Sequence, residues 1–150
     1  KLAAILDAAR VAPTGANKQP FNLLVVQSAD GLEKVNRSTN IYNAPLAIIV
    51  LGDRDKVWVR PFDGKSILDI DTSIVTDHMM LQATELGIGS VWICYFKPDV
   101  LKKEFNIPDN LEPVSILALG YADGPAESPH RHELNRKPLS ELVSYERLQG

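Results

Sequence analysis

The sequence predicts a layered α/β domain, because helix-like and strand-like hydrophobic patterns alternate along its 150 residues. No internal repeat, low-complexity tract or obvious linker interrupts this alternation, so we expect one domain over residues 1–150. A chain of this length would bury roughly 70% of the surface of its extended form. A hydrophobic core of ordinary size is therefore possible.

The first elements are a helix and two strands. The helix is indicated by apolar residues at helical spacing, namely Leu2, Ile5, Leu6 and Ala9. It should end near Val11, because Pro13 disfavours helical geometry in the residue before it. The short aliphatic and β-branched runs 21–27 and 46–52 are better suited to buried strands than to helices.

A long helix should follow, with Asp69 or Asp71 as its N-cap and Gly87 as its left-handed stop. Its apolar residues cover more than one face, which indicates burial on several sides; they are Ile74, Val75, Met79, Leu81 and Leu86. In a monomer this would be an ordinary core helix.

The last third should contain two more strands and two more helices. Residues 90–96 form an apolar segment bounded by Gly89 and Pro98, and Pro98 suits the first position of a helix through Phe105. Residues 114–121 are a further strand pattern. Residues 122–136 are rich in Pro, Gly, Ser, His and charge, so we expect them to run over the surface or across a partner before a short helix at 138–145.

Composition excludes several classes of function. The net charge of −3 and the lack of long runs of like charge give no reason to expect nucleic acid. The apolar runs are far shorter than the ~20 residues that span a bilayer, so we expect no membrane association. The single cysteine, Cys94, cannot form an intrachain disulfide. We therefore expect a cytoplasmic protein.

One segment points to a binding site. Residues 12–20 carry no apolar side chain larger than alanine or proline, and Pro13 and Pro20 restrict the backbone at both ends. Backbone N–H groups from Thr14 to Gln19 could bind polar oxygens or the edge of a heterocycle. The alternative is a structural turn, because turns use the same residues.

The segment 5–21 also resembles the "AAR-x-AP-S/T-x-x-N-x-QP-aromatic" signature of the FMN-dependent nitroreductase superfamily. Later motifs match in the same order, namely 83–93, 117–121 and 135–143. The resemblance implies an α+β, nitroreductase-like fold with a central, mainly antiparallel sheet flanked by helices. It also implies an intertwined homodimer with the long helix at the interface, and a domain that is N-terminally truncated relative to the family, whose members usually carry an Arg-rich segment ahead of this point.

The resemblance further implies a noncovalently bound FMN that both subunits hold. The residues that match its contacts are Pro13, Thr14, Gly15 and Asn17 in the first loop, Cys94 and Tyr95 beside flavin N5, and Arg136 and Lys137 at the phosphate. A guanidinium can bind a phosphate through two N–H groups, and lysine adds a point charge. Many relatives carry glycine where this chain has Cys94 and Tyr95.

The implied reaction is a ping-pong transfer of hydride from NADH or NADPH, through flavin N5, to a nitroaromatic, a quinone or a similar small molecule, with no protein acid or base. The alternatives are a flavin-binding or storage module without efficient turnover, and a structural dimer with a decayed flavin site. Trp58, Phe62 and Tyr42 could line the substrate side, although packing beneath an irregular loop is the interpretation we favour.

Other catalytic constellations are not indicated. A lone cysteine in an apolar strand is usually a small core residue, so we do not expect Cys94 to form a nucleophilic site with a histidine. His130 and His132 lack partners at metal-ligand spacing, so we expect no metal. No glycine-rich phosphate loop of the Rossmann or Walker type occurs.

Overall fold

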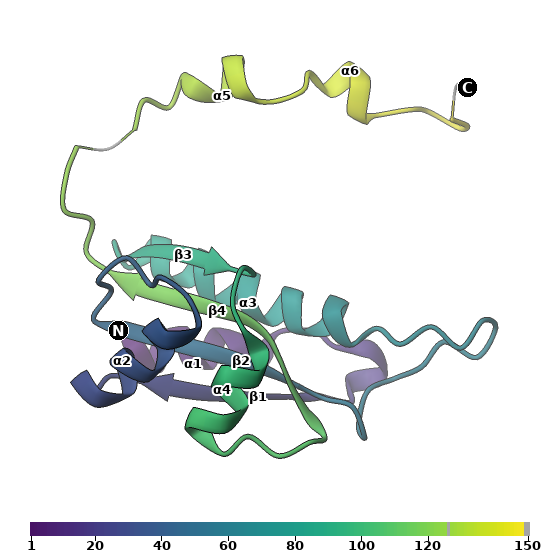
Figure 1. Cartoon of the computed structure of the whole chain (residues 1–150). Coiled ribbons are helices and arrows are strands. Elements are labelled where there is room, and N and C mark those ends of the chain that lie inside the picture. Colours follow the sequence, from purple (N-terminus) through teal and green to yellow (C-terminus); the bar gives the residue numbers. More distant parts are fainter. Residues whose placement is uncertain (126, 149–150) are drawn as a thin grey trace.

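The computed structural model, which describes residues 1–125 and 127–148, contains one four-stranded sheet (Figure 1). The strands are β1 (Phe21–Val26), β2 (Leu46–Asp53), β3 (Gly89–Ile93) and β4 (Leu111–Gly120), and their order in the sheet is β1-β2-β4-β3. All three pairs of neighbours are antiparallel. The predicted α+β class is therefore confirmed. The α/β class suggested by the alternating pattern is wrong, because that pattern predicts layers and not strand directions.

Helices cover both faces of the sheet. The helices of the chain are α1 (Leu2–Val11), α2 (Ala29–Ser38), α3 (Leu68–Glu85), α4 (Pro98–Phe105), α5 (Arg131–Asn135) and α6 (Leu139–Leu142), with a short 3₁₀ turn, η1 (Gly15–Asn17). Helices α1 and α3 pack together on one face, and α2 and α4 pack together on the other. No helix among the described residues is both long and apolar enough to cross a bilayer.

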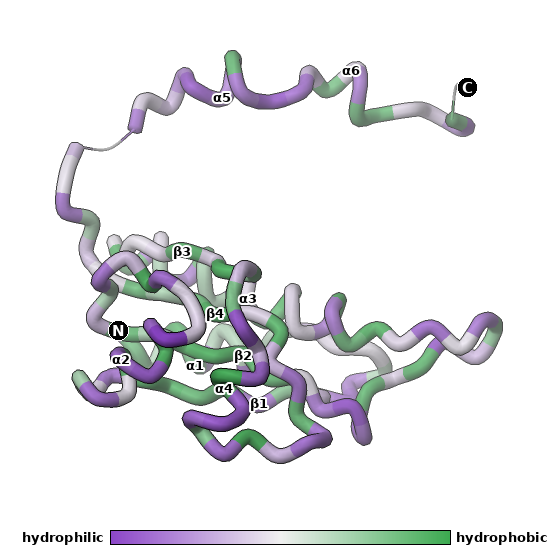
Figure 2. Tube along the Cα trace, viewed as in Figure 1, coloured by the Kyte–Doolittle hydropathy of each residue, from purple (hydrophilic) through white to green (hydrophobic). Residues whose placement is uncertain are grey.

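The two central strands are buried on both sides. Along β2, Ile48 and Val50 contact the layer of α1 and α3, whereas Ala47 and Ile49 contact the layer of α2 and α4. This alternation follows from the period of two in a strand. Because helices cover both faces of β2, this strand is apolar at nearly every position, as Figure 2 shows. Burying one isoleucine side chain stabilises the fold by roughly 1.5–3 kcal/mol.

Several element ends lie where the sequence placed them. Helix α1 ends at Val11, Pro98 is the first residue of α4, and Gly87 has a φ of 70° just after α3. Helix α2 was not predicted, although Ser28 caps it by accepting a hydrogen bond from the Gly31 N–H at 3.1 Å. The sequence of α2 is mostly polar, and only Leu32 and Val35 provide large apolar side chains at helical spacing, which is too short a pattern to predict a helix.

Two local predictions are wrong. Neither Asp69 nor Asp71 caps α3, because the helix starts earlier, with Ile67 as its N-cap and no capping side chain. The third strand ends at Ile93, since the chain leaves the sheet there. Cys94 is therefore exposed beyond the strand and is not a core residue.

Residues 127–148, which we call the C-terminal arm, stand away from the body of the molecule (Figure 1). Their side chains are exposed, including large apolar ones, namely Leu134, Leu139, Leu142 and Tyr145. Helix α5 was not predicted, and α6 is shorter than the expected helix at 138–145. An arm that presents apolar side chains without covering its own body is suited to packing on another surface.

Candidate functional site

The loop between α1 and β1 is compact and internally bonded. The Asn17 N–H donates to the Thr14 carbonyl and the Lys18 N–H to the Gly15 carbonyl, both at 3.0 Å. The Gln19 N–H donates to Thr14 Oγ1, also at 3.0 Å. These bonds fix the loop as one short turn, in agreement with the rigidity that its prolines predict.

The same loop is strained. Ala16, Asn17 and Gln19 have φ values of 50°, 53° and 50°, in the left-handed region that residues other than glycine seldom adopt. Each such residue costs on the order of 1–3 kcal/mol, and clusters of them occur preferentially at functional sites. Asparagine tolerates the conformation, but alanine has no side-chain group to compensate for it.

The strained turn leaves hydrogen-bond donors free. Within the described part of the chain, the backbone N–H groups of Thr14 and Ala16 find no protein acceptor. The Asn17 side chain is exposed beside them and adds an amide. This donor set suits a ligand that presents several oxygen acceptors.

A buried carboxylate holds the loop to the body of the molecule. The Gly15 N–H donates to Asp71 Oδ1 at 2.9 Å, across 56 residues of sequence. A Cβ on Gly15 would lie 2.3 Å from Ile67 Cδ1 and 3.2 Å from Trp58 Cβ, so the loop sits directly on the start of α3. Sequence reasoning missed the role of Asp71, since no local signal reveals a partner so far along the chain.

Cys94 and Tyr95 follow β3 on the edge of the sheet. The Tyr95 side chain is 94% exposed, and its carbonyl accepts a hydrogen bond from Thr39 Oγ1 at 2.6 Å. Cys94 borders a hollow of about 320 Å³ that Arg54 and Lys102 also line. The two residues are accessible to a ligand, as a cofactor contact requires.

Arg136 and Lys137 lie on the C-terminal arm, between α5 and α6, and both are exposed. The arm stands apart from the body, so the described chain by itself does not bring them to the loop of Thr14 or to Cys94 (Figure 1). The grouping of all eight residues therefore stays a prediction that requires a second copy.

The aromatic residues differ from expectation. Phe62 is 93% exposed and Tyr42 is also exposed, so the idea that they pack beneath a loop is wrong. Phe62 lies at the tip of a hairpin between β2 and α3, closed by an Arg60–Asp63 ion pair and a bridge between Val59 and Ser66. Only Trp58 is half-buried, next to Gly15.

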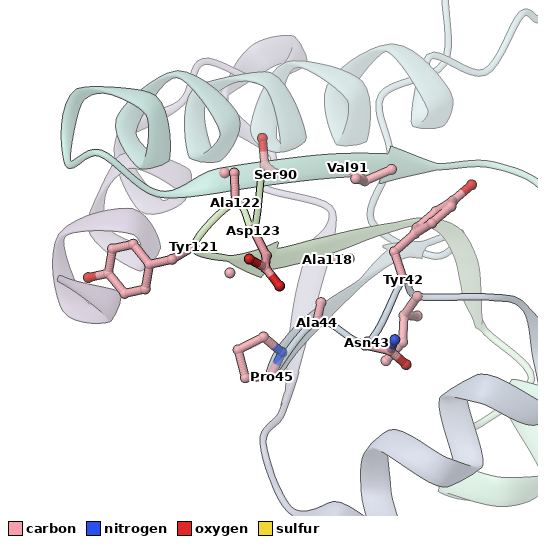
Figure 3. A pocket seen from close by; sticks show the side chains of 13 residues that line it. Tyr42, Asn43, Ala44, Pro45, Ser90, Val91, Ala118, Tyr121, Ala122 and Asp123 are labelled. Carbon is pink, nitrogen blue, oxygen red and sulfur yellow. The ribbon is translucent and has the colours of Figure 1, made fainter. Parts of the chain in front are cut away.

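A second hollow, of about 490 Å³, lies at the Gly89 end of β3 (Figure 3). Tyr42, Val91 and Asp123 line it from three segments of the chain, and the Asp123 carboxylate points into it. None of the eight predicted cofactor contacts lines it. Among the described residues, no group of three His, Cys, Asp or Glu side chains could hold a metal ion.

Residues 33–121 match a family model described as "Nitroreductase family". The chain is 32% identical over 143 residues to a protein of Methanothermobacter thermautotrophicus that is provisionally named NADH dehydrogenase/NAD(P)H nitroreductase. The match covers 87% of this chain and 68% of that protein.

Solved structures agree with the sequence match. A nitroreductase family protein from Clostridium difficile 630 is 63% identical, with a TM-score of 0.96 over 98% of this chain and 86% of that one. An FMN-dependent nitroreductase from Clostridium difficile R20291 has a TM-score of 0.77 at 24% identity, over 98% of this chain and 87% of that one. The second likeness concerns the fold alone.

Proposed function

The chain belongs to the nitroreductase family, and we propose that it is an FMN-dependent oxidoreductase that passes reducing equivalents from NADH or NADPH to a small-molecule acceptor. The provisional name of the archaeal relative supports an oxidoreductase that uses a nicotinamide donor. The FMN-dependent protein with the same fold supports the choice of flavin. A nitroaromatic or a quinone is the acceptor class we propose.

The observation that carries this proposal is the strained loop at η1. Its free Thr14 and Ala16 N–H groups and the Asn17 amide form a donor set that fits the oxygen-rich parts of FMN, which are the ribityl hydroxyls, the phosphate and the carbonyls of the ring. Gly15 has no side chain to obstruct close approach. Pro13 lies next to this turn and restricts its entry.

We propose that the site is completed by a second copy of the chain. Arg136 and Lys137 would bind the phosphate, because a guanidinium and an ammonium are suited to a dianion. The exposed apolar side chains of the C-terminal arm support a homodimer, as do Ile70 and Leu81, which are exposed on α3. Burial of these side chains against a partner would provide the driving force.

Bound FMN would supply the redox chemistry itself, accepting a hydride from NADH or NADPH and giving it to the acceptor in a ping-pong sequence. The residues of this chain would bind and orient. Thr14, Ala16 and Asn17 would fix the cofactor, and the backbone N–H groups of Cys94 and Tyr95 would donate to the edge of its ring. Neither role requires a side chain to gain or lose a proton.

The test is spectroscopic. Purified protein, or protein refilled with FMN, should show flavin absorbance that bleaches when NADH or NADPH is added without oxygen, and the colour should return with a quinone. Flavin absorbance without bleaching would instead indicate a binding or storage module. Protein that is colourless and takes up no FMN would indicate a structural role and would contradict the proposal.

A further inference from the structure

Asp71 is an unusual buried group. It lies in the first turn of α3 and is 1% exposed, yet only one of its oxygens has a partner. Oδ1 accepts the Gly15 N–H at 2.9 Å, whereas Oδ2 has no hydrogen bond within the described part of the chain. The positive end of the helix dipole offsets part of the cost of burying a carboxylate, but one hydrogen bond does not satisfy it.

The hydrogen bond from the Gly15 N–H to Asp71 Oδ1 is important for where it holds the loop. The other hydrogen bonds of the turn are local: they join Thr14, Gly15, Asn17, Lys18 and Gln19 to one another, and the Gln19 carbonyl accepts the Phe21 N–H at the start of β1. These local bonds fix the shape of the turn, but they do not fix its position against α3. In the first half of the turn, the bond to Asp71 is what ties the backbone to α3.

The bond also sits between the two free donors. Gly15 uses its own N–H for Asp71, and its neighbours Thr14 and Ala16 have N–H groups with no protein acceptor in the described chain. The side chains of Ile67 and Trp58 also pack against the backbone of Gly15. The turn is thus held at its middle residue, with a free donor on either side.

We propose that Asp71 is a positioning residue, which does not touch the cofactor but holds Gly15 so that the Thr14 and Ala16 N–H groups stay preorganised to bind FMN. This inference rests on the proposed function. A strained turn that is fixed before binding loses less conformational freedom on binding, and this raises affinity. The single unsatisfied oxygen also follows from this role, since the carboxylate is retained for the loop and not for the stability of the helix.

The test compares Asp71→Ala with Asp71→Asn in the full chain. Asparagine keeps an oxygen that can accept the Gly15 N–H, whereas alanine leaves that N–H without a partner. The apo-protein is titrated with FMN, hydrogen exchange is measured over residues 14–20 without FMN, and the Tm of each apo-protein is recorded. Asp69→Ala is the matched control, because Asp69 is exposed in the same helical turn.

We expect Asp71→Ala to raise the Kd for FMN about tenfold or more and to speed exchange in the loop, because an unsatisfied donor costs several times RT. Asp71→Asn should restore the Kd to within about threefold of the wild type. Asp69→Ala should match the wild type in both measurements. Should Asp71→Ala not fold, Asp71→Ser provides the second route, since its shorter side chain keeps a polar group in the first turn of α3 but no longer reaches the Gly15 N–H.

Each outcome decides a separate point. If the wild type binds FMN and Asp71→Ala binds it equally well, the positioning role is wrong and the proposed function stands. If Asp71→Asn binds as weakly as Asp71→Ala and both have a lowered Tm, Asp71 is structural and the inference is also wrong. If the wild type takes up no FMN, the proposed function fails and this role fails with it.

Discussion

The ammonium of Lys56 lies 3.0 Å from Oδ2 of Asp53, a carboxylate that is almost completely buried at the end of β2. The other oxygen, Oδ1, accepts hydrogen bonds from the Asp55 N–H at 3.1 Å and from Asn110 Nδ2 at 3.3 Å. The bond to Lys56 makes the largest contribution to holding the pKa of Asp53 below its ordinary value of 3.8, and burial opposes it. The folded state therefore favours the ionised carboxylate.

The first prediction is that this carboxylate stabilises the fold only above acidic pH. A lowered folded pKa gives stability that is present above the unfolded pKa and is lost as the pH falls through the folded value. Asp53→Asn should cost roughly 0.5–1 kcal/mol at pH 7, because Lys56 is largely solvent-exposed. Urea denaturation at pH 7, 4 and 3 should show the difference from the wild type shrinking below about pH 4. A difference that stayed constant over this range would show that the charge of Asp53 is irrelevant.

The second prediction concerns the left-handed residue after α3. Gly87 has a φ of 70°, and a Cβ added to it would meet no atom within 4 Å. Gly87→Ala should therefore lower the free energy of unfolding by about 1 kcal/mol through backbone strain alone. Gly87→Asn is the matched control and should cost less, since asparagine tolerates this conformation. Equal losses in the two variants, measured by chemical denaturation, would mean that the conformation is not what the glycine provides.

Sequence reasoning located the parts of the fold that depend on local chemistry. The stop at Gly87, the start at Pro98 and the apolar run of β2 each follow from the residues themselves. Strand direction does not, because the antiparallel pairing of β2 with β4 joins segments far apart in the chain. The sequence pattern does not reveal helix α2, since half of its residues are exposed and most of those are polar or charged.

The candidate site likewise has features that the sequence predicts and features that only the fold reveals. The polar composition of residues 12–20 marked the loop, but nothing in it indicates that Ala16 adopts a left-handed conformation. The contact that joins this turn to α3 is equally hidden in the sequence, because Asp71 at a helix start predicts a cap and instead accepts the Gly15 N–H. The arm with Arg136 could be placed near the loop only through family resemblance, because one chain does not bring the two together (Figure 1).

The third prediction tests the proposed cofactor contacts. Asn17→Ala and Arg136→Ala should each weaken FMN binding by about 1–3 kcal/mol, because each removes a hydrogen-bonding group from a polar ligand and Arg136 also removes a charge. Equilibrium titration of the apo-protein with FMN measures the effect. The thermal stability of the Arg136→Ala apo-protein should remain that of the wild type, since its side chain is exposed. Asn17→Ala should lower the Tm slightly, because Asn17 has a φ of 53° and alanine tolerates this conformation less well than asparagine does.

Two neighbouring residues serve as controls for this pair. Lys18→Ala alters the same loop, and Arg131→Ala removes a guanidinium from the same arm, yet neither residue belongs to the proposed contacts. Both controls should bind FMN with the wild-type Kd. Wild-type affinity in Asn17→Ala and Arg136→Ala would remove the site assignment, whereas equal weakening by Arg131→Ala would indicate a general effect of charge.

The last prediction concerns the arm as a dimer contact. Leu139 and Leu142 are exposed on α6, and we expect a second copy to bury them. Replacing both with serine should shift the protein from dimer to monomer in sedimentation velocity, because each buried leucine contributes roughly 1.5–3 kcal/mol. Glu141→Ser alters a polar position of the same helix and should leave the dimer intact. The double variant should also lose FMN affinity, since in the proposed dimer Arg136 would reach the site only through the partner. A wild-type protein that sediments as a monomer at micromolar concentration would contradict the two-copy site.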